Sequence, residues 1–118
     1  MIFVKDMDRM TTFYRDAVGL RVRSGVPSDG WVEFDAGSSS LALHAIPPAI
    51  ADRITITDPP QQRSNTPLKL IFETPDLNAA RAHLASHGAV MHEPRNTGSC
   101  DGLDPEGNVF CIVTPREK

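Results

Sequence analysis

The two halves of this chain repeat one order of apolar runs, helix signals and turn signals, and this repeat strongly constrains the fold. Each half begins with a short apolar run, at 2–4 in the first half and at 68–72 in the second. An aspartate, a helical pattern and a glycine follow each run in turn. Such a repeat predicts that the chain folds as two copies of one supersecondary unit.

The two predicted helices have matching ends. Apolar residues recur every three or four positions in both, which places them on one face of a helix. Asp6 or Asp8 can cap the first helix and Asp76 the second, while Gly19 and Gly88 can end them. Gly19 comes thirteen positions after Asp6, and Gly88 comes twelve positions after Asp76. This agreement is the best internal indication of a duplication.

Three strand-like runs follow each predicted helix. Turn-forming residues fill several of the breaks between them, at 27–30, 36–40 and 104–107. The runs lie at 20–26, 31–35 and 41–45 in the first half and at 89–92, 99–103 and 109–113 in the second. The order β-α-β-β-β is therefore expected twice, which predicts an α+β fold.

The length of 118 residues suits one domain and is too short for two independent ones. We predict a single domain in which module 1 spans 1–46, a proline-rich linker spans 47–66 and module 2 spans 67–118. The linker is expected to be a mobile crossover loop with a short extended piece at 54–56. The alternative is a lid over a cavity, because long loops in compact domains are often functional.

Charge, apolar runs and cysteine content argue against several classes of protein. The formal net charge of −3 gives no basic field that would attract nucleic acid. No apolar run approaches the roughly 18 residues of a membrane-spanning helix, and the first residues do not resemble a signal peptide. Cys100 and Cys111 show no CxxC spacing. We expect a cytoplasmic protein that binds neither nucleic acid nor membrane.

Several motifs occur in the order typical of one known superfamily. They lie at 3–7, 13–16, 19–20, 31–34, 41–44 and 104–108, and the last is Asp-Pro-Glu-Gly-Asn. On these motifs the sequence resembles the glyoxalase / bleomycin-resistance / dioxygenase (vicinal oxygen chelate) superfamily over nearly its whole length. The resemblance implies two βαβββ modules that form a curved, cup-shaped mixed β-sheet with the helices outside. It implies either a metal-dependent lyase, isomerase, dioxygenase or thiol transferase, or a metal-free protein that sequesters an antibiotic.

Alternation along the predicted strands separates two sets of side chains, because successive residues point to opposite faces. The more apolar set is expected to pack beneath the helices: Val32, Phe34, Leu41, Leu43, Leu68, Leu70, Phe72, Phe110 and Ile112. The more polar set is expected to face the cup: Phe3, Lys5, Trp31, Glu33, Ala42, His44, Lys69, Ile71, Glu73, Val109, Cys111 and Val113.

The resemblance implies His and Glu metal ligands on the first and fourth strands of each module. The first ligand position aligns just before the start of the chain, and the fourth-strand position falls at Ala42 or His44. The two positions in module 2 hold Lys69 and Cys111. A protonated lysine has no lone pair for a cation, so we expect neither a metal nor another cofactor. The alternative is an atypical zinc, nickel, manganese or iron site built from Glu33, His44 and Cys111.

Two of the predicted ligand-binding residues belong to module 2. Lys69 suits an anionic oxygen of a ligand, or it pairs with Glu73 or Glu33 and has only a structural role. Cys111 is expected to be a small buried hydrophobe rather than a nucleophile. A neighbouring Lys69 is expected to lower the pKa of its thiol.

The other three predicted ligand-binding residues, Trp31, Glu33 and His44, belong to module 1. Trp31 offers a flat face for a planar ligand, or it only fills the wall of the module. His44 is a general base, a hydrogen-bond partner of a ligand or a core histidine. Glu33 would supply a carboxylate from a position that the superfamily does not normally use.

We therefore predict a protein that binds a small organic molecule, an antibiotic or a metabolite, in its cup. No catalytic residue is assigned. The alternatives are a lyase or dioxygenase with the atypical metal site, and a degenerate module that serves only in assembly. We expect a homodimer, because proteins that the sequence resembles commonly dimerise, sometimes by exchanging modules.

Overall fold

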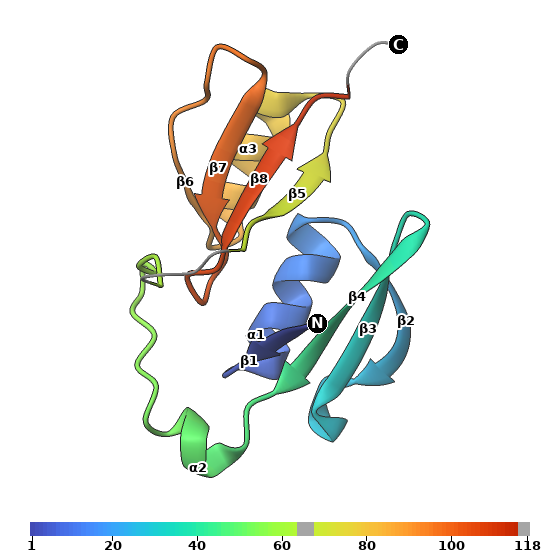
Figure 1. Cartoon of the computed structure of the whole chain (residues 1–118), viewed down its shortest axis with the longest axis vertical. Helices are drawn as coiled ribbons and strands as arrows, with labels where there is room; N and C mark the ends of the chain where they lie inside the picture. The colour runs from blue at the N-terminus through green and yellow to red at the C-terminus, as the bar shows by residue number, and fades with distance from the viewer. Residues whose placement is uncertain (64–67, 116–118) are drawn as a thin grey trace. The chain divides into compact units, whose positions relative to one another are not determined.

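A computed structural model describes residues 1–63 and 68–115 of the chain. The residues group into two compact units, 1–55 and 56–118 (Figure 1). Each unit contains a four-stranded mixed sheet. Within the described ranges, no helix is long and apolar enough to cross a membrane.

The first unit has the element order β-α-β-β-β that the sequence predicts. Its elements are β1 (Ile2–Val4), α1 (Met7–Thr12), a π-helix (Phe13–Ala17), β2 (Arg21–Val26), a 3-10 turn (Pro27–Asp29), β3 (Trp31–Ala36) and β4 (Ser39–Ala45). The strand order in the sheet is β1-β4-β3-β2. β1 runs parallel to β4, and the other neighbouring strands are antiparallel.

The second unit repeats this plan. Its elements are β5 (Leu70–Glu73), α3 (Leu77–Ser86), β6 (Val90–Met91), β7 (Ser99–Leu103) and β8 (Val109–Val113). The strand order is β5-β8-β7-β6, with β5 parallel to β8 and the other pairs antiparallel. The shared strand order and the matching parallel pair confirm the prediction of two βαβββ modules.

The helix ends also agree between the units. Asp6 and Asp76 are the N-caps, and in each case the carboxylate accepts a 3.0 Å hydrogen bond from the backbone N–H three residues on. Gly19 and Gly88 follow the helices with φ values of +87° and +96°, a conformation that favours glycine. The first helix differs in its last turn, where a π-helix buries both Phe13 and Tyr14.

Each sheet buries one face against the helix of its own unit. In the first unit the buried strand residues include Val4, Val32, Phe34, Leu41 and Leu43, and the helical residues include Met10 and Tyr14. In the second unit Phe110, Ile112 and Cys100 are buried with Leu84 of α3, which lies behind β7 and β8 in Figure 1.

Burial confirms most of the set that was expected beneath the helices. Leu70 and Phe72 are half-buried. The prediction is wrong for Leu68, which is 74% exposed. The reason is that β5 begins only at Leu70, so Leu68 lies outside the strand.

The predicted linker is attached to each unit by polar contacts. A short helix, α2 (Pro48–Ala51), occupies its start, and 54–56 form no paired strand. Lys5 donates from Nζ to the carbonyl oxygens of Ala51, at 2.8 Å, and of Ile54. Arg63 donates from Nε to the carbonyl oxygen of Glu106 at 3.0 Å. The end of the predicted linker, at 64–66, lies outside the described residues, and the lid role stays a prediction.

The Asp-Pro-Glu-Gly-Asn motif forms a buried turn before β8. Asp104 is fully buried, and its Oδ1 accepts 2.9 Å hydrogen bonds from the N–H groups of Glu106 and Asn108. Its Oδ2 accepts a 2.8 Å bond from Asn108 Nδ2. A Cβ on Gly107 would lie 2.1 Å from the carbonyl oxygen of Gln61. The motif therefore has a structural role, because it closes the turn and lets the linker approach it.

Candidate functional site

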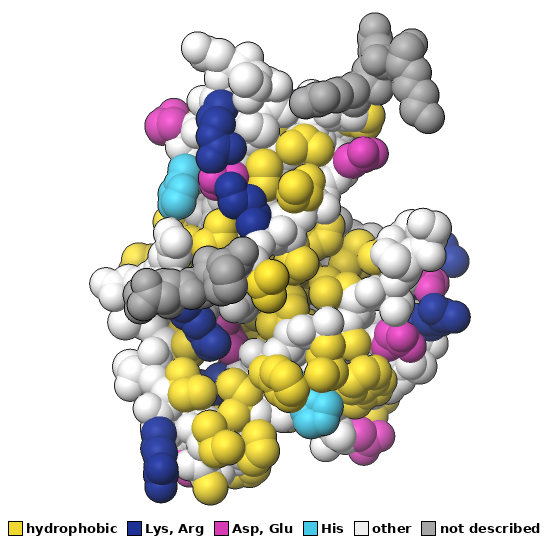
Figure 2. Space-filling model, viewed as in Figure 1, with side chains coloured by type: hydrophobic (Ala, Val, Ile, Leu, Met, Phe, Trp, Pro, Cys, Tyr) yellow, Lys and Arg dark blue, Asp and Glu magenta, His cyan; other side chains and the backbone are white. Residues whose placement is uncertain are grey.

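Aromatic side chains lie together on the face of the first sheet that α1 does not cover. We call them the aromatic row: Phe3, His44 and Trp31. The three residues occupy adjacent strands in register, since His44 pairs with both Phe3 and Trp31. The ring centroids are 5.4 Å apart for Phe3 and His44 and 6.0 Å apart for Trp31 and His44. Figure 2 shows hydrophobic side chains gathered around a histidine over this sheet.

The aromatic row is accessible. Phe3 is 53% exposed and Trp31 is 36% exposed, and His44 is exposed as well. The next residues in the strands, Val4 and Val32, are fully buried. Strand alternation therefore leaves one face of the sheet exposed and the other buried, as the sequence predicts.

Local contacts define the orientation of the His44 ring. Nδ1 lies 2.8 Å from the carbonyl oxygen of Ala45. A carbonyl oxygen only accepts, so Nδ1 carries the hydrogen of this bond. In the neutral ring, Nε2 then has a lone pair that can accept a hydrogen bond from a ligand.

Glu33 lies on the same face of the first sheet as the aromatic row. It pairs in register with Ala42 on β4, and Ser24 Oγ donates a 3.3 Å hydrogen bond to its carboxylate. Ala42 itself is buried and offers no ligand atom. Of the two candidate fourth-strand positions, only His44 carries a side chain that can bind a ligand through a polar atom.

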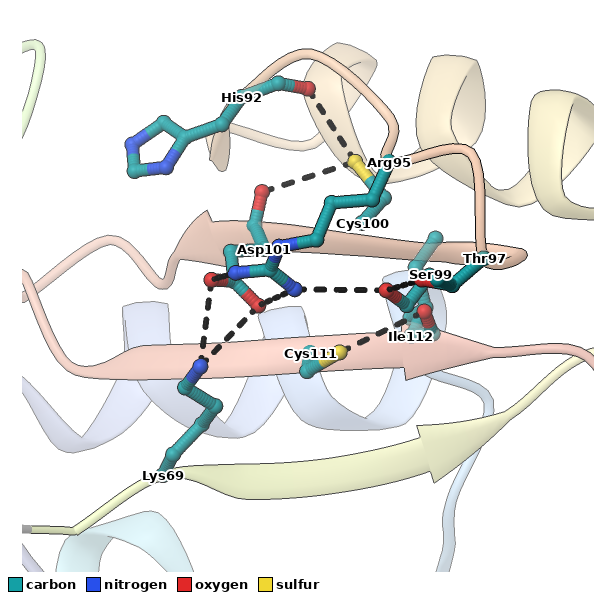
Figure 3. Close-up of polar contacts among 9 residues, drawn as sticks. All are labelled: Lys69, His92, Arg95, Thr97, Ser99, Cys100, Asp101, Cys111 and Ile112. Atoms are coloured by element: carbon teal, nitrogen blue, oxygen red, sulfur yellow. Dashed lines mark hydrogen bonds and ion pairs between the residues drawn. The ribbon is translucent and has the colours of Figure 1, made fainter.

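Charged side chains gather instead on the face of the second sheet that α3 does not cover. Asp101 on β7 is central, in register with Cys111 on β8, which in turn pairs with Ile71 on β5. Lys69 Nζ lies 3.2 Å from Asp101 Oδ2, and Arg95 Nη1 lies 3.2 Å from Oδ1. Arg95 Nη2 also donates to Oδ2. Figure 3 shows Lys69 and Arg95 approaching this one carboxylate, and we call the three residues the charged triad.

The charged triad affects the protonation of both Asp101 and Cys111. Burial alone would raise the pKa of the Asp101 carboxyl, but hydrogen bonds from Arg95 and Lys69 outweigh burial and hold the pKa below its usual value. Burial and the hydrogen bond to Asp101 raise the pKa of the Cys111 thiol. Lys69 lowers the pKa of Cys111, as predicted, but burial and Asp101 outweigh its effect, so the net change is upward.

Of the two roles left open for Lys69, the pairing with Glu73 or Glu33 is wrong. Lys69 pairs with Asp101, 32 positions away in the sequence, rather than with Glu73 or Glu33. Asp101 and Arg95 were missed because they lie in the weakest predicted strand and in the loop before it. The local signal was that Ser99 and Asp101 alternate with Cys100 and Gly102, which are buried, on β7.

Residues 1–113 match a family model described as a glyoxalase-like domain. The chain belongs to this family. The match confirms the resemblance to the vicinal oxygen chelate superfamily that the sequence motifs indicate. A search of curated proteins finds no match.

Solved structures share the fold of this glyoxalase-like domain. A glyoxalase/bleomycin resistance protein/dioxygenase family enzyme from Burkholderia phytofirmans is 21% identical, with a TM-score of 0.67 over 96% of this chain and 93% of that one. TnmS3, an antibiotic binding protein from Streptomyces, is 24% identical, with a TM-score of 0.63 over 98% and 91%. The fosfomycin resistance protein FosX from Mesorhizobium loti is 16% identical, with a TM-score of 0.69 over 97% and 86%.

The side chains at the implied metal-ligand positions of this glyoxalase-like domain do not fit a divalent cation. Lys69 Nζ lies 3.2 Å from Asp101 Oδ2, and a protonated lysine has no lone pair for a cation. Cys111 is buried with a raised pKa, whereas a metal ligand is a thiolate. Among the residues that the structure describes, no three His, Cys, Asp or Glu side chains form a metal-binding group.

The structure thus collects the predicted ligand-binding residues into two groups. Trp31 and His44 join Phe3 in the aromatic row, with Glu33 on the same face. Lys69 and Cys111 join Asp101 and Arg95 in the second unit.

Proposed function

We propose that this glyoxalase-like domain binds a small organic molecule, an antibiotic or a metabolite, without a metal ion. One observation carries the proposal. At the positions that the resemblance assigns to metal ligands in module 2, the chain has an ammonium group paired with a carboxylate and a buried thiol of raised pKa. The ammonium group has no lone pair for a cation, and a cation would have to displace the proton of the thiol.

The aromatic row supports a planar ligand. Aromatic rings stack in offset or edge-to-face geometry, so the exposed faces of Phe3 and Trp31 suit a flat apolar molecule. His44 adds an acceptor at Nε2 for an N–H or O–H group of that molecule. The name of TnmS3 as an antibiotic binding protein supports the antibiotic as one ligand class.

Trp31 is the single tryptophan of the chain and reports on the aromatic row directly. We expect saturable quenching of its fluorescence by planar aromatic compounds from a panel that includes antibiotics, in protein stripped with a chelator. Phe3→Ala should weaken binding about three- to tenfold, because it removes one stacking surface worth about 1 kcal/mol. Ile50→Ala is the matched control, since Ile50 is similarly exposed, at 55%, but lies on α2.

Two results would contradict the proposal. One is unchanged Trp31 emission across the whole panel. The other is a stoichiometric metal in the purified protein whose removal abolishes quenching. That second result would favour the alternative, a lyase or dioxygenase with an atypical metal site from Glu33, His44 and Cys111.

A further inference from the structure

We propose that Lys69 and Arg95 together bind one anionic group, a carboxylate or a phosphoryl group, of a small organic molecule at the second unit. This inference rests on the proposed function, because it takes the ligand of the domain to be a small organic molecule. It starts from a juxtaposition that no sequence pattern shows: two cationic side chains from different loops converge on one carboxylate.

The charged triad has a surplus of positive charge. Lys69 and Arg95 are both cations at neutral pH, and Asp101 is their shared anion. The group therefore carries a local charge of about +1 in a chain whose formal net charge is −3. Two other ion pairs, Arg23 with Asp35 and Arg81 with Glu93, each join one cation to one carboxylate.

Hydrogen-bond donors remain for a second anion. The Arg95 guanidinium has five N–H groups. Its bonds use Nη1, toward Asp101 and toward Ser99 Oγ at 3.3 Å, and Nη2, toward Asp101. The guanidinium also interacts with the thiol of Cys111. Within the described part of the chain, none of the hydrogen bonds from Arg95 to protein oxygens uses Nε–H. The ammonium group of Lys69 has three N–H groups and two contacts, both to Asp101.

Asp101 orders these donors while leaving them accessible. Its side chain is only 16% exposed, whereas Lys69 is 41% exposed and Arg95 is 51% exposed. Both cations are held by the same two carboxylate oxygens, so an arriving anion meets donors that are already oriented. Such charge-assisted hydrogen bonds are stronger than neutral ones, and an arginine fork is suited to carboxylate and phosphoryl oxygens.

The test is a titration followed by ¹⁵N NMR at the Arg95 Nε–H signal, which Arg95→Gln identifies by removing it. The probes are benzoate and phenylphosphonate, with the neutral benzamide as the matched compound. We expect saturable shifts with both anions and none with benzamide. Lys69→Gln should weaken anion binding about three- to tenfold, and 0.5 M salt should weaken it further.

Arg23→Gln is the control variant, because Arg23 is an exposed arginine beside a carboxylate in the first unit. It should leave anion binding unchanged. The proposal is overturned if neither anion shifts the Arg95 signal, or if Arg23→Gln weakens binding as much as Lys69→Gln. Because the readout is Arg95 and not Trp31, these failures are distinguishable from failure of the proposed function, which neutral planar compounds test at Trp31.

Discussion

The two modules share one plan but differ in the chemistry of the sheet face that their helix leaves uncovered. In the first unit this face has the aromatic row across β1, β4 and β3. In the second unit the corresponding face has the charged triad, with Asp101 on β7 and with Lys69 and Arg95 in the segments before β5 and β7. The helix-covered faces, in contrast, are uniformly apolar in both units. The two modules therefore share apolar packing beneath the helix, while the residue types on the other face of the sheet differ.

The largest expected effect tests this division between the two faces. Phe34→Ala in the first unit and Phe110→Ala in the second should each lower the free energy of unfolding by about 3–5 kcal/mol, because both rings are buried. Phe3→Ala should lower it by less than about 1 kcal/mol, because the ring is 53% exposed. Urea denaturation followed by circular dichroism measures all three. A loss at Phe3 as large as the loss at Phe34 would contradict the division.

A glycine in each sheet provides the second comparison. Gly25 has φ +86°, and an added Cβ would lie 2.2 Å from the backbone oxygen of Trp31. Gly25→Ala should therefore lower the free energy of unfolding by more than about 2 kcal/mol. Gly102→Ala should lower it by less than about 1.5 kcal/mol, because an added Cβ meets the flexible end of Met91.

Gly19→Ala separates backbone strain from steric contact in this comparison. Gly19 has φ +87° but nothing within 4 Å of an added Cβ, so the expected loss is about 1 kcal/mol. Urea denaturation measures the three glycine variants in parallel. Equal losses at Gly25 and Gly19 would show that the approach to Trp31 contributes nothing.

The helix caps should behave alike in the two modules. Asp6→Ala and Asp76→Ala should each lower the free energy of unfolding by about 1 kcal/mol, because both carboxylates accept a backbone hydrogen bond at 3.0 Å. Asp8→Ala, in the first turn of α1, should have a smaller effect. Thermal and urea unfolding measure these losses. A loss of stability at only one of the two caps would contradict the equivalence of the modules.

The smallest expected effect concerns the charged triad and its dependence on pH. The pKa of Asp101 in the folded protein lies below its usual value. The ionised carboxylate therefore stabilises the fold above about pH 4, the usual Asp pKa. This stabilisation is lost as the pH falls through the pKa of the folded protein. The pH-dependent part should be about 0.2–1 kcal/mol, because both cations are well exposed. Urea denaturation between pH 3 and pH 7 measures it against Asp101→Asn, which should lack this part. A gain in stability on acidification would contradict the assignment.

Local sequence patterns were sufficient for most of the fold. β8 has the bounds that were predicted, and the N-caps Asp6 and Asp76 and the glycines after the helices are where the spacing placed them. The errors lie where a local sequence pattern does not determine the structure. Leu68 continues an apolar run past the start of β5, and hydropathy alone does not mark where strand pairing begins.

The candidate site could be predicted only in part, because local patterns do not show contacts between residues far apart in the sequence. Trp31 and His44 were identified because each lies at an alternating position of a strong strand. Asp101 and Arg95 were not, because their importance depends on contact with Lys69 far away in the sequence. The predicted homodimer, the cytoplasmic location and the joint cup stay predictions.

The sequence by itself determined the two βαβββ modules, their helix caps and the apolar face of each sheet. These features follow from periodicities of two and 3.6 residues and from short turn motifs, which act over a few positions. Only the tertiary structure decided that Asp101 is the partner of Lys69 and that the Cys111 thiol has a raised pKa. Strand register places Asp101 beside Cys111, and the segments before β5 and β7 bring Lys69 and Arg95 to the same carboxylate. No local stretch of the chain encodes these contacts or the burial that follows from them.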